Sequence, residues 1–296
     1  MAISGLFDVP APAKLNLFLH VTGRRADGYH LLDSLMVLID WCDTLHLERR
    51  GDGRLARHDR GATLPDDDLC LKAARALQQA SQTPFGVDMT IEKRIPWAAG
   101  LGGGSSDAAT TLLALNRLWG LDWPLERLLP VGLALGADVP FFLAGANARV
   151  AGIGERIEPV ALAPAWFAVV KPEAGLATGA VFASPRVARP ASATPAAEGG
   201  AARIPGFSAA APDLPGGFGR NDLQAAAEDL CPDVARAAAG LVARFGNSRM
   251  TGSGSAVFAR VGQDEASAGA WPAGWTSRIC RSLERHPLAG WARRGV

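Results

Sequence analysis

The sequence lacks any uncharged run of about 18 apolar residues, so it predicts no membrane-spanning helix. Its opening stretch, MAISGLFDVPAPAK, has neither the charged start nor the apolar core of a signal peptide. No basic tail or block longer than an arginine pair occurs, and the net charge is +1, which argues against a nucleic-acid partner. The four cysteines form no Cys-x-x-Cys pair, so they predict reduced thiols in a cytoplasmic protein rather than a zinc site or a disulfide framework.

Lysine is also scarce. Only four of the 30 basic residues are lysines: Lys14, Lys72, Lys93 and Lys171. Because the other 26 basic residues are all arginines, each lysine is a candidate for a site that requires a compact ammonium group on a thin stem.

The chain is long enough for two domains, and its hydrophobic fraction of 48% is sufficient for globular cores. A proline-flanked link followed by an apolar strand places the predicted boundary near residue 160, which gives domains at 1–160 and 161–296. Within the second domain, residues 187–217 are low in complexity and rich in alanine, proline and glycine. This composition predicts a surface loop with little capacity to pack.

Hydrophobic periodicity predicts a series of helices and strands. Residues 13–21 alternate as a strand that places Lys14 and Asn16 on one face. Three consecutive aspartates, residues 66–68, favour a helix start at about 68–80. The remaining expected elements are strands at 44–49, 86–95, 160–172 and 250–261, and helices from residue 124, at 222–230 and at 233–245.

The stretch GLGGGSSDAATTLL, residues 100–113, is a glycine-rich loop that leads into a helix. Glycines allow backbone N–H groups to approach an anion, and a helix N-terminus adds partial positive charge, so the stretch predicts a phosphate site. It is not a P-loop, which needs Lys before Ser or Thr, and it does not match the dinucleotide fingerprint. Ser105 or Ser106 is the expected helix cap, and Asp107 is expected to be a cap or a solvated charge.

The segment IPWAAGLGGGSSDAA resembles the second motif of the GHMP kinases, the superfamily of galactokinase, homoserine kinase and mevalonate kinase. PAPAKLNLFLHVTGRRADGYHLLDSLM resembles the N-terminal motif of those members that act on 4-diphosphocytidyl-2-C-methyl-D-erythritol, and LGADVPFFLAGANARVAGIGERI and MTGSGSAVFA resemble their remaining segments. The chain departs from the family at Trp97 and Ala98, where Met and Gly are usual.

The resemblance implies an α/β (α+β) fold of two domains. The N-terminal domain would be ribosomal-protein-S5-domain-2-like, the C-terminal domain ferredoxin-like, and the active site would lie in the cleft between them. It also implies ATP and Mg²⁺ as cofactors, and phosphorylation of the substrate 2-hydroxyl to give the 2-phosphate and ADP in non-mevalonate isoprenoid biosynthesis. Protein ligands of the metal are not implied.

The resemblance also assigns roles to individual residues. Lys14 and Asp138 match the catalytic pair, with Asp138 accepting or orienting the hydroxyl proton. Tyr29 and Phe182 would stack on the cytosine, and His30 would bond its polar edge. The implied ATP-binding residues are Pro96, Trp97, Ala98, Ala99, Gly100, Leu101, Gly102, Gly103, Gly104, Ser105 and Ser106. The other implied substrate contacts are Asn16, Thr178, Thr251, Gly252, Ser253, Gly254 and Ser255, with Thr178 alternatively a helix cap.

Two other functions remain open on the sequence. One keeps the fold but changes the substrate to homoserine, mevalonate or a sugar. The other is a nucleotide-binding module without catalysis, against which the simultaneous presence of Lys14 and Asp138 argues. The expected partners are the cytidylyl substrate and ATP, with no nucleic acid and no membrane, and the expected assembly is a monomer or a weak homodimer.

Overall fold

The structure is a computed structural model that describes residues 3–61, 63–187 and 219–293. The strands are β1 (Gly5–Arg24), β2 (His30–Arg50), β3 (Leu55–Arg60), β4 (Gly86–Glu92), β5 (Ala148–Gly152), β6 (Arg156–Pro159), β7 (Trp166–Lys171), β8 (Arg249–Met250), β9 (Val257–Val261) and β10 (Thr276–Leu283). The helices are α1 (Leu69–Ser81), α2 (Gly103–Leu118), α3 (Leu125–Leu135), α4 (Val139–Ala144), α5 (Thr178–Ala183), α6 (Gln224–Leu230) and α7 (Pro232–Phe245). All but the first residue of the predicted low-complexity loop at 187–217 lie outside the described residues.

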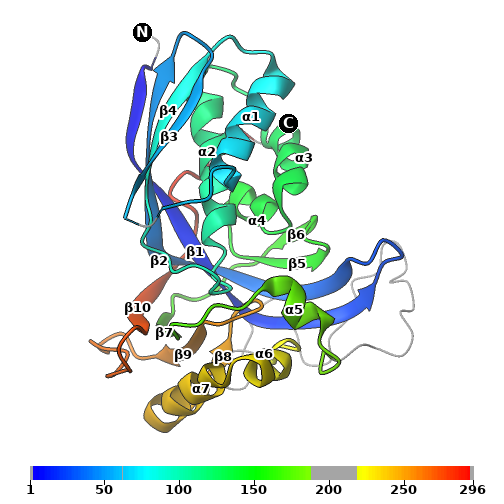
Figure 1. Cartoon of the computed structure of the whole chain (residues 1–296), viewed down its shortest axis with the longest axis vertical. Helices are drawn as coiled ribbons and strands as arrows, with labels where there is room; N and C mark the ends of the chain where they lie inside the picture. The colour runs from blue at the N-terminus through cyan, green and yellow to red at the C-terminus, as the bar shows by residue number, and fades with distance from the viewer. Residues whose placement is uncertain (1–2, 62, 188–218, 294–296) are drawn as a thin grey trace.

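The long strand β2 connects the parts of the sheet. β1 runs antiparallel beside nearly all of it, β5 pairs with residues 32–36, and β4 pairs with residues 44–50. At Leu38 and Ile39, β2 also pairs with β10, which continues the sheet through β7, β9 and β8. The β1–β2 hairpin therefore crosses the molecule between α1–α4 and the layer formed by β7–β10 (Figure 1). The strand predicted at 44–49 is the last third of β2.

Buried apolar side chains form three clusters among the described residues. The first packs α1–α4 against β2 and β4, and the second packs α6 and α7 against β7 and β9. The third lies between them and combines β1 and β2 residues with Phe167 of β7 and Phe258 of β9. It also contains Ile95, Ala99 and Leu101, so the apolar members of the glycine loop are anchored where the two halves meet. The division at residue 160 stays a prediction.

The N-termini of α1 and α2 test the predicted helix start at the aspartate run and the predicted serine cap. At α1 the prediction is confirmed, because the Asp68 carboxylate accepts hydrogen bonds from the N–H groups of Cys70 and Leu71. At α2 the prediction of a serine cap is wrong. The N-cap is Gly102, in the left-handed conformation with φ 73°, and it provides no side-chain hydrogen bond. A glycine can make this turn without strain, so the helix starts before the serines and the N–H groups of its first turn have no side-chain cap.

The C-terminal segment after β10 returns to the first half of the fold. His286 N–H donates to the carbonyl of Gly145 (2.9 Å), Leu125 N–H donates to the carbonyl of Arg293 (2.8 Å), and Leu288 is buried in the first cluster. The last described residues of the chain therefore lie beside the start of α3. Within the described ranges, none of the helices has both the length and the apolar character that a membrane crossing would require.

Candidate active site

A cavity of about 550 Å³ lies at the start of α2 and is bounded by the glycine loop, α1, β1 and the loop between β8 and β9. Three of the four lysines line it: Lys14, Lys72 and Lys93. Asp67, Asp68, Asp107 and Asp138 line it as well, so it is the N-terminus of α2, rather than an excess of positive side chains, that favours an anionic ligand. Apart from Ser106, every predicted ATP-binding residue lines the cavity.

The glycines of this loop are required by close packing. Gly100 and Gly102 both have positive φ angles, 70° and 73°. A Cβ atom on Gly102 would lie 3.1 Å from Cγ of Lys14 and 3.0 Å from the Phe142 ring. In addition, Lys14 N–H donates to the Leu101 carbonyl (3.0 Å). The absence of a side chain at Gly102 therefore allows the Lys14 stem to lie directly against the loop.

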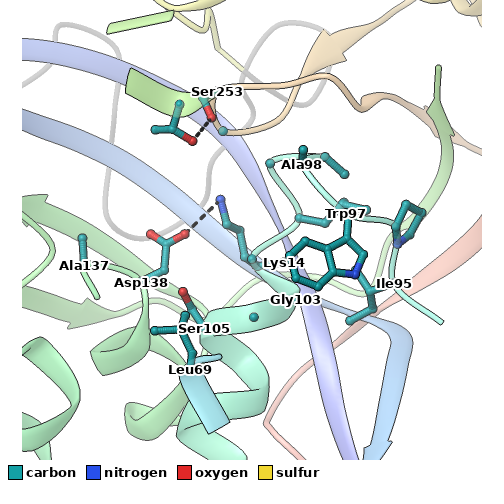
Figure 2. A pocket seen from close by; sticks show the side chains of 18 of the residues that line it. Lys14, Leu69, Ile95, Trp97, Ala98, Gly103, Ser105, Ala137, Asp138 and Ser253 are labelled. Atoms are coloured by element: carbon teal, nitrogen blue, oxygen red, sulfur yellow. Dashed lines mark hydrogen bonds and ion pairs between the residues drawn. The ribbon is translucent and has the colours of Figure 1, made fainter. Parts of the chain in front are cut away.

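Lys14 and Asp138 point toward each other across the cavity (Figure 2). Their Nζ and Oδ2 atoms are 3.5 Å apart, the Lys14 side chain is only 3% exposed, and that of Asp138 is 32% exposed. Lys14 comes from β1, whereas Asp138 is the N-cap residue of α4 but makes no side-chain capping bond. Its carboxylate is thus directed at the ammonium group and the cavity.

The side chain of Asn16 contacts the ammonium group of Lys14 and restrains its position. Lys14 Nζ donates to Asn16 Oδ1 (2.5 Å), and Asn16 Nδ2 donates to Ser34 Oγ (2.8 Å). Thr251 completes the network, because its Oγ1 accepts from Asn16 N–H (3.0 Å) and donates to Asn16 Oδ1 (3.2 Å). Thr251 is fully buried and does not line the cavity, so its position supports Asn16.

The small-residue turn at 251–255 packs on the glycine loop. Ser255 and Ala256 donate backbone hydrogen bonds to the carbonyls of Ala98 and Ala99, each at 3.1 Å. A Cβ on Gly100 would lie only 2.1 Å from the Thr251 carbonyl oxygen. Gly252, Ser253 and Gly254 line the cavity, whereas Ser255 is buried and donates its hydroxyl to the Ala174 carbonyl (2.6 Å).

The two family departures occupy the edge of the same loop. Ala98 has a φ of 47°, a left-handed conformation that favours glycine. A Cβ atom added to Gly175 would lie only 2.7 Å from the Cβ of Ala98, so these two residues are in close contact. Trp97 is 50% exposed and lines the cavity, next to Ala98 (Figure 2). The alanine at position 98 therefore adopts this left-handed conformation at a cost in backbone strain.

Phe182 lines the cavity from α5, and the His30 ring stacks on it with a centroid distance of 4.9 Å. Tyr29 is 62% exposed and is not among the lining residues, nor is His30. Thr178 is the first residue of α5 rather than its cap, which is Ala177. The Thr178 hydroxyl instead lies 2.9 Å from the Ser253 hydroxyl, which connects α5 to the turn at 251–255.

A buried cluster of three ionisable side chains was not predicted from the sequence. Lys93 Nζ donates to carboxylate oxygens of Asp43 and Asp107, and all three side chains are at most 5% exposed. Asp107 is therefore not the cap or solvated charge that was expected. Its neighbours in α2 are buried on every side, because the first residues of this helix lie between the sheet and α1. Lysine scarcity was the only signal that pointed to this cluster.

The lobe of the cavity beside α1 was also missed. It is lined by Leu64, Pro65, Asp68, Leu69 and Lys72, and Leu69 lies next to the start of α2 in Figure 2. Arg57 fixes this loop through hydrogen bonds to the carbonyls of Leu64 and Pro65 and an ion pair with Asp68. Within the described ranges no group of three or more His, Cys, Asp or Glu side chains could hold a metal ion.

Comparison with known proteins places this geometry in a family. The family described as GHMP kinases, N terminal domain, matches residues 68–146. The 4-diphosphocytidyl-2-C-methyl-D-erythritol kinase of Methylibium petroleiphilum is 58% identical over 99% of this chain and 100% of its own length. That of Verminephrobacter eiseniae is 55% identical over 98% of this chain and 99% of its own. The chain belongs to the 4-diphosphocytidyl-2-C-methyl-D-erythritol kinase family. It is therefore a small-molecule kinase, as the N-terminal motif predicted.

Solved structures agree with this assignment. A crystal structure of a 4-(cytidine 5'-diphospho)-2C-methyl-D-erythritol kinase is 35% identical, with a TM-score of 0.67 over 86% of this chain and 89% of the other. A homoserine kinase from Cytophaga hutchinsonii also has a TM-score of 0.67 and covers 96% of both chains, but at 17% identity it shows the fold alone. The prediction of the GHMP kinase fold is confirmed by these kinase structures.

Proposed function

We propose that this chain transfers the γ-phosphoryl group of ATP to the 2-hydroxyl of 4-diphosphocytidyl-2-C-methyl-D-erythritol. The observation that carries the proposal is the meeting of Lys14 and Asp138 at the phosphate-binding end of α2. Family membership supports the choice of substrate, because relatives more than 50% identical over nearly the whole chain carry that substrate in their names.

The glycine loop and the first turn of α2 would hold the ATP phosphates. Backbone N–H groups of Gly103, Gly104 and Ser105 have no side-chain cap and border the cavity, and the helix dipole adds to their attraction for an anion. The lobe beside α1 is lined by Leu64, Pro65 and Leu69, an apolar wall that suits a purine base. Mg²⁺ would come with the nucleotide and be bound largely by phosphates and water.

The chemical step needs an acceptor for one proton and stabilisation of charge on the phosphoryl group. The substrate hydroxyl oxygen attacks the γ-phosphorus, and the bond to the bridging oxygen breaks, which releases ADP. Asp138 takes the hydroxyl proton, or orients it toward itself, because its carboxylate faces the cavity without a capping bond. Lys14, held by Asn16, neutralises the charge that spreads over the transferring oxygens.

The cytidylyl end of the substrate would lie toward α5. Phe182 offers a ring face in the cavity wall, and its stack with His30 keeps that face fixed. Aromatic faces bind any base, so discrimination of cytosine would come from hydrogen bonds, for which His30 is the proposed donor or acceptor. Tyr29 would have to approach from its exposed position on the β1–β2 hairpin.

One assay tests the proposal. ADP release with Mg²⁺ and ATP is compared for 4-diphosphocytidyl-2-C-methyl-D-erythritol, mevalonate, homoserine and galactose. We expect the kcat/KM for the cytidylyl substrate to exceed that for each of the others by on the order of 10⁴-fold, the discrimination of a site built to hydrogen-bond its substrate. Equal or faster turnover of another alcohol would contradict the substrate. ATP binding without any turnover would favour a non-catalytic nucleotide module.

A further inference from the structure

The cluster formed by Lys93, Asp43 and Asp107 lies in the wall of the nucleotide cavity. Lys93 follows β4, Asp43 belongs to β2, and Asp107 is in the second turn of α2. Lys93 Nζ contacts Oδ2 of both carboxylates, at 2.6 Å for Asp107. Lys93 and Asp107 both line the cavity, although each side chain is at most 5% exposed. The cluster therefore borders the proposed ATP site directly.

Asp43 and Lys93 form the charge-balanced part of this cluster. One oxygen of Asp43 contacts Lys93, and the other accepts hydrogen bonds from the N–H groups of Arg94 (2.5 Å) and Ile95 (2.8 Å). These bonds fix the chain just before the glycine loop. All the donors suit an ionised carboxylate, which cancels the charge of one ammonium group.

Asp107 supplies a second carboxyl group to the same single ammonium. Its Oδ1 atom is buried and, in the part of the chain that the structure describes, has no hydrogen-bond partner. The groups that face it are Lys93 from the end of β4, Asp43 from β2 and the thiol of Cys70 from α1. Burial raises the pKa of Asp107 to about 8, aided by the charge of Asp43 and opposed by Lys93. One ammonium group between two buried carboxyl groups therefore favours the protonated form of Asp107.

We propose that Asp107 controls ATP affinity through its proton: the protonated form permits binding, and ionisation weakens it. This inference rests on the proposed use of ATP. With Asp107 protonated, Lys93 and Asp43 cancel and the cavity wall is neutral. With Asp107 ionised, the wall carries one uncompensated negative charge, buried where screening by water is weak, against a ligand that is itself a polyanion. ATP binding and proton uptake by Asp107 are then linked.

Calorimetric titration with Mg²⁺ and ATP, without acceptor substrate, measures this linkage. At pH 8 the nucleotide phosphates are already ionised, so proton uptake, obtained by comparing buffers of different ionisation enthalpy, reports the protein. We expect the unmodified chain to take up a fraction of a proton on binding and to lose affinity by on the order of tenfold between pH 7 and pH 9. Asp107→Asn should take up none and keep its affinity across that range.

A matched control is Asp122→Asn, which makes the same change at an exposed position beyond the other end of α2. It should behave like the unmodified chain. Binding of ATP by the unmodified chain without proton uptake, or the same pH dependence in Asp107→Asn, would overturn this inference alone. Failure to bind ATP at any pH would contradict the proposed function, and this inference with it.

Discussion

Lys14 and Asp138 reach the cavity from β1 and from the start of α4, and neither has another charged partner in the ion pairs of the described residues. We expect Lys14→Met or Asp138→Asn to lower kcat by on the order of 10²- to 10⁴-fold with ATP binding retained. The double variant should lose far less than the product of the two single losses, because residues that act as a unit are non-additive. Steady-state kinetics and nucleotide titration check this.

Lys14→Arg is the control for the chemical nature of the cation. The Lys14 stem lies against Gly102, and its ammonium is held by Asn16, so a wider guanidinium has little space. It should be nearly as impaired as Lys14→Met. An active Lys14→Arg enzyme would mean that positive charge is sufficient, and full turnover in Asp138→Asn would remove that residue from the mechanism.

Phe182 and Tyr29 were assigned the same role by resemblance, but the structure gives them different positions. Phe182 lines the cavity, whereas Tyr29 is exposed on the hairpin. Base stacking contributes on the order of 1–3 kcal/mol. Phe182→Ala should therefore raise the KM for the cytidylyl substrate about tenfold or more, with the KM for ATP unchanged. Tyr29→Ala should have the smaller effect, and the opposite order in the measured KM values would contradict this assignment.

At the scale of elements, the site depends on the contact between two glycine-containing turns. A methyl group on Gly100 would meet the Thr251 carbonyl oxygen at 2.1 Å and would also have to adopt a φ of 70°. We expect Gly100→Ala to lower the free energy of unfolding by about 3 kcal/mol, the sum of overpacking and left-handed strain. It should also weaken ATP binding, because the turn at 251–255 has to move away from the loop.

Gly120→Ala separates these two contributions. Gly120 has a similar φ of 66°, but a Cβ there would meet nothing within 4 Å. Its substitution should cost only about 1 kcal/mol of strain and leave ATP affinity unchanged. Denaturant unfolding of both variants gives the comparison, and equal losses would show that the turns do not restrain each other.

At the scale of the whole molecule, His286 connects the end of the chain to the first half of the fold. Burial lowers its pKa to about 4, whereas an unfolded chain has a histidine pKa near 6.5. The folded state therefore favours the neutral ring. The resulting stability is fully present above about pH 6.5 and is lost as the pH falls through 6.5 toward 4, by about 3 kcal/mol.

Unfolding in denaturant at pH 7.5 and pH 4.5 tests this prediction. Carboxylates also titrate in this range, so the relevant quantity is the difference between variants. His286→Gln should show a smaller loss of stability on acidification than the unmodified chain. A pH dependence unaltered in His286→Gln would mean that His286 is protonated without cost.

Part of the site follows from local sequence alone. The glycine run, the alternation of Lys14 and Asn16 along one strand and the Asp68 cap depend on neighbouring residues, because φ preference, strand periodicity and capping are local properties. Lysine scarcity indicated positions of special chemistry. Three of the four lysines are buried, and each of these ammonium groups is held by named oxygen atoms: Lys14 by Asn16 and Asp138, Lys93 by two aspartates, and Lys171 by three backbone carbonyls.

Tertiary structure decided the rest. No local pattern indicates that Gly102, rather than a serine, is the N-cap of α2. A side chain at this position would collide with the Lys14 stem, which belongs to a strand about 90 positions earlier in the chain. Likewise, the position of Asp107 just after the glycine loop is typical of an exposed helix-capping aspartate. In the structure, the sheet and α1 bury it against Lys93 and Asp43. The sequence by itself determined which residues could bind phosphate and move a proton. Only packing between distant segments decided which of them are desolvated, because burial depends on what the whole chain places around a group.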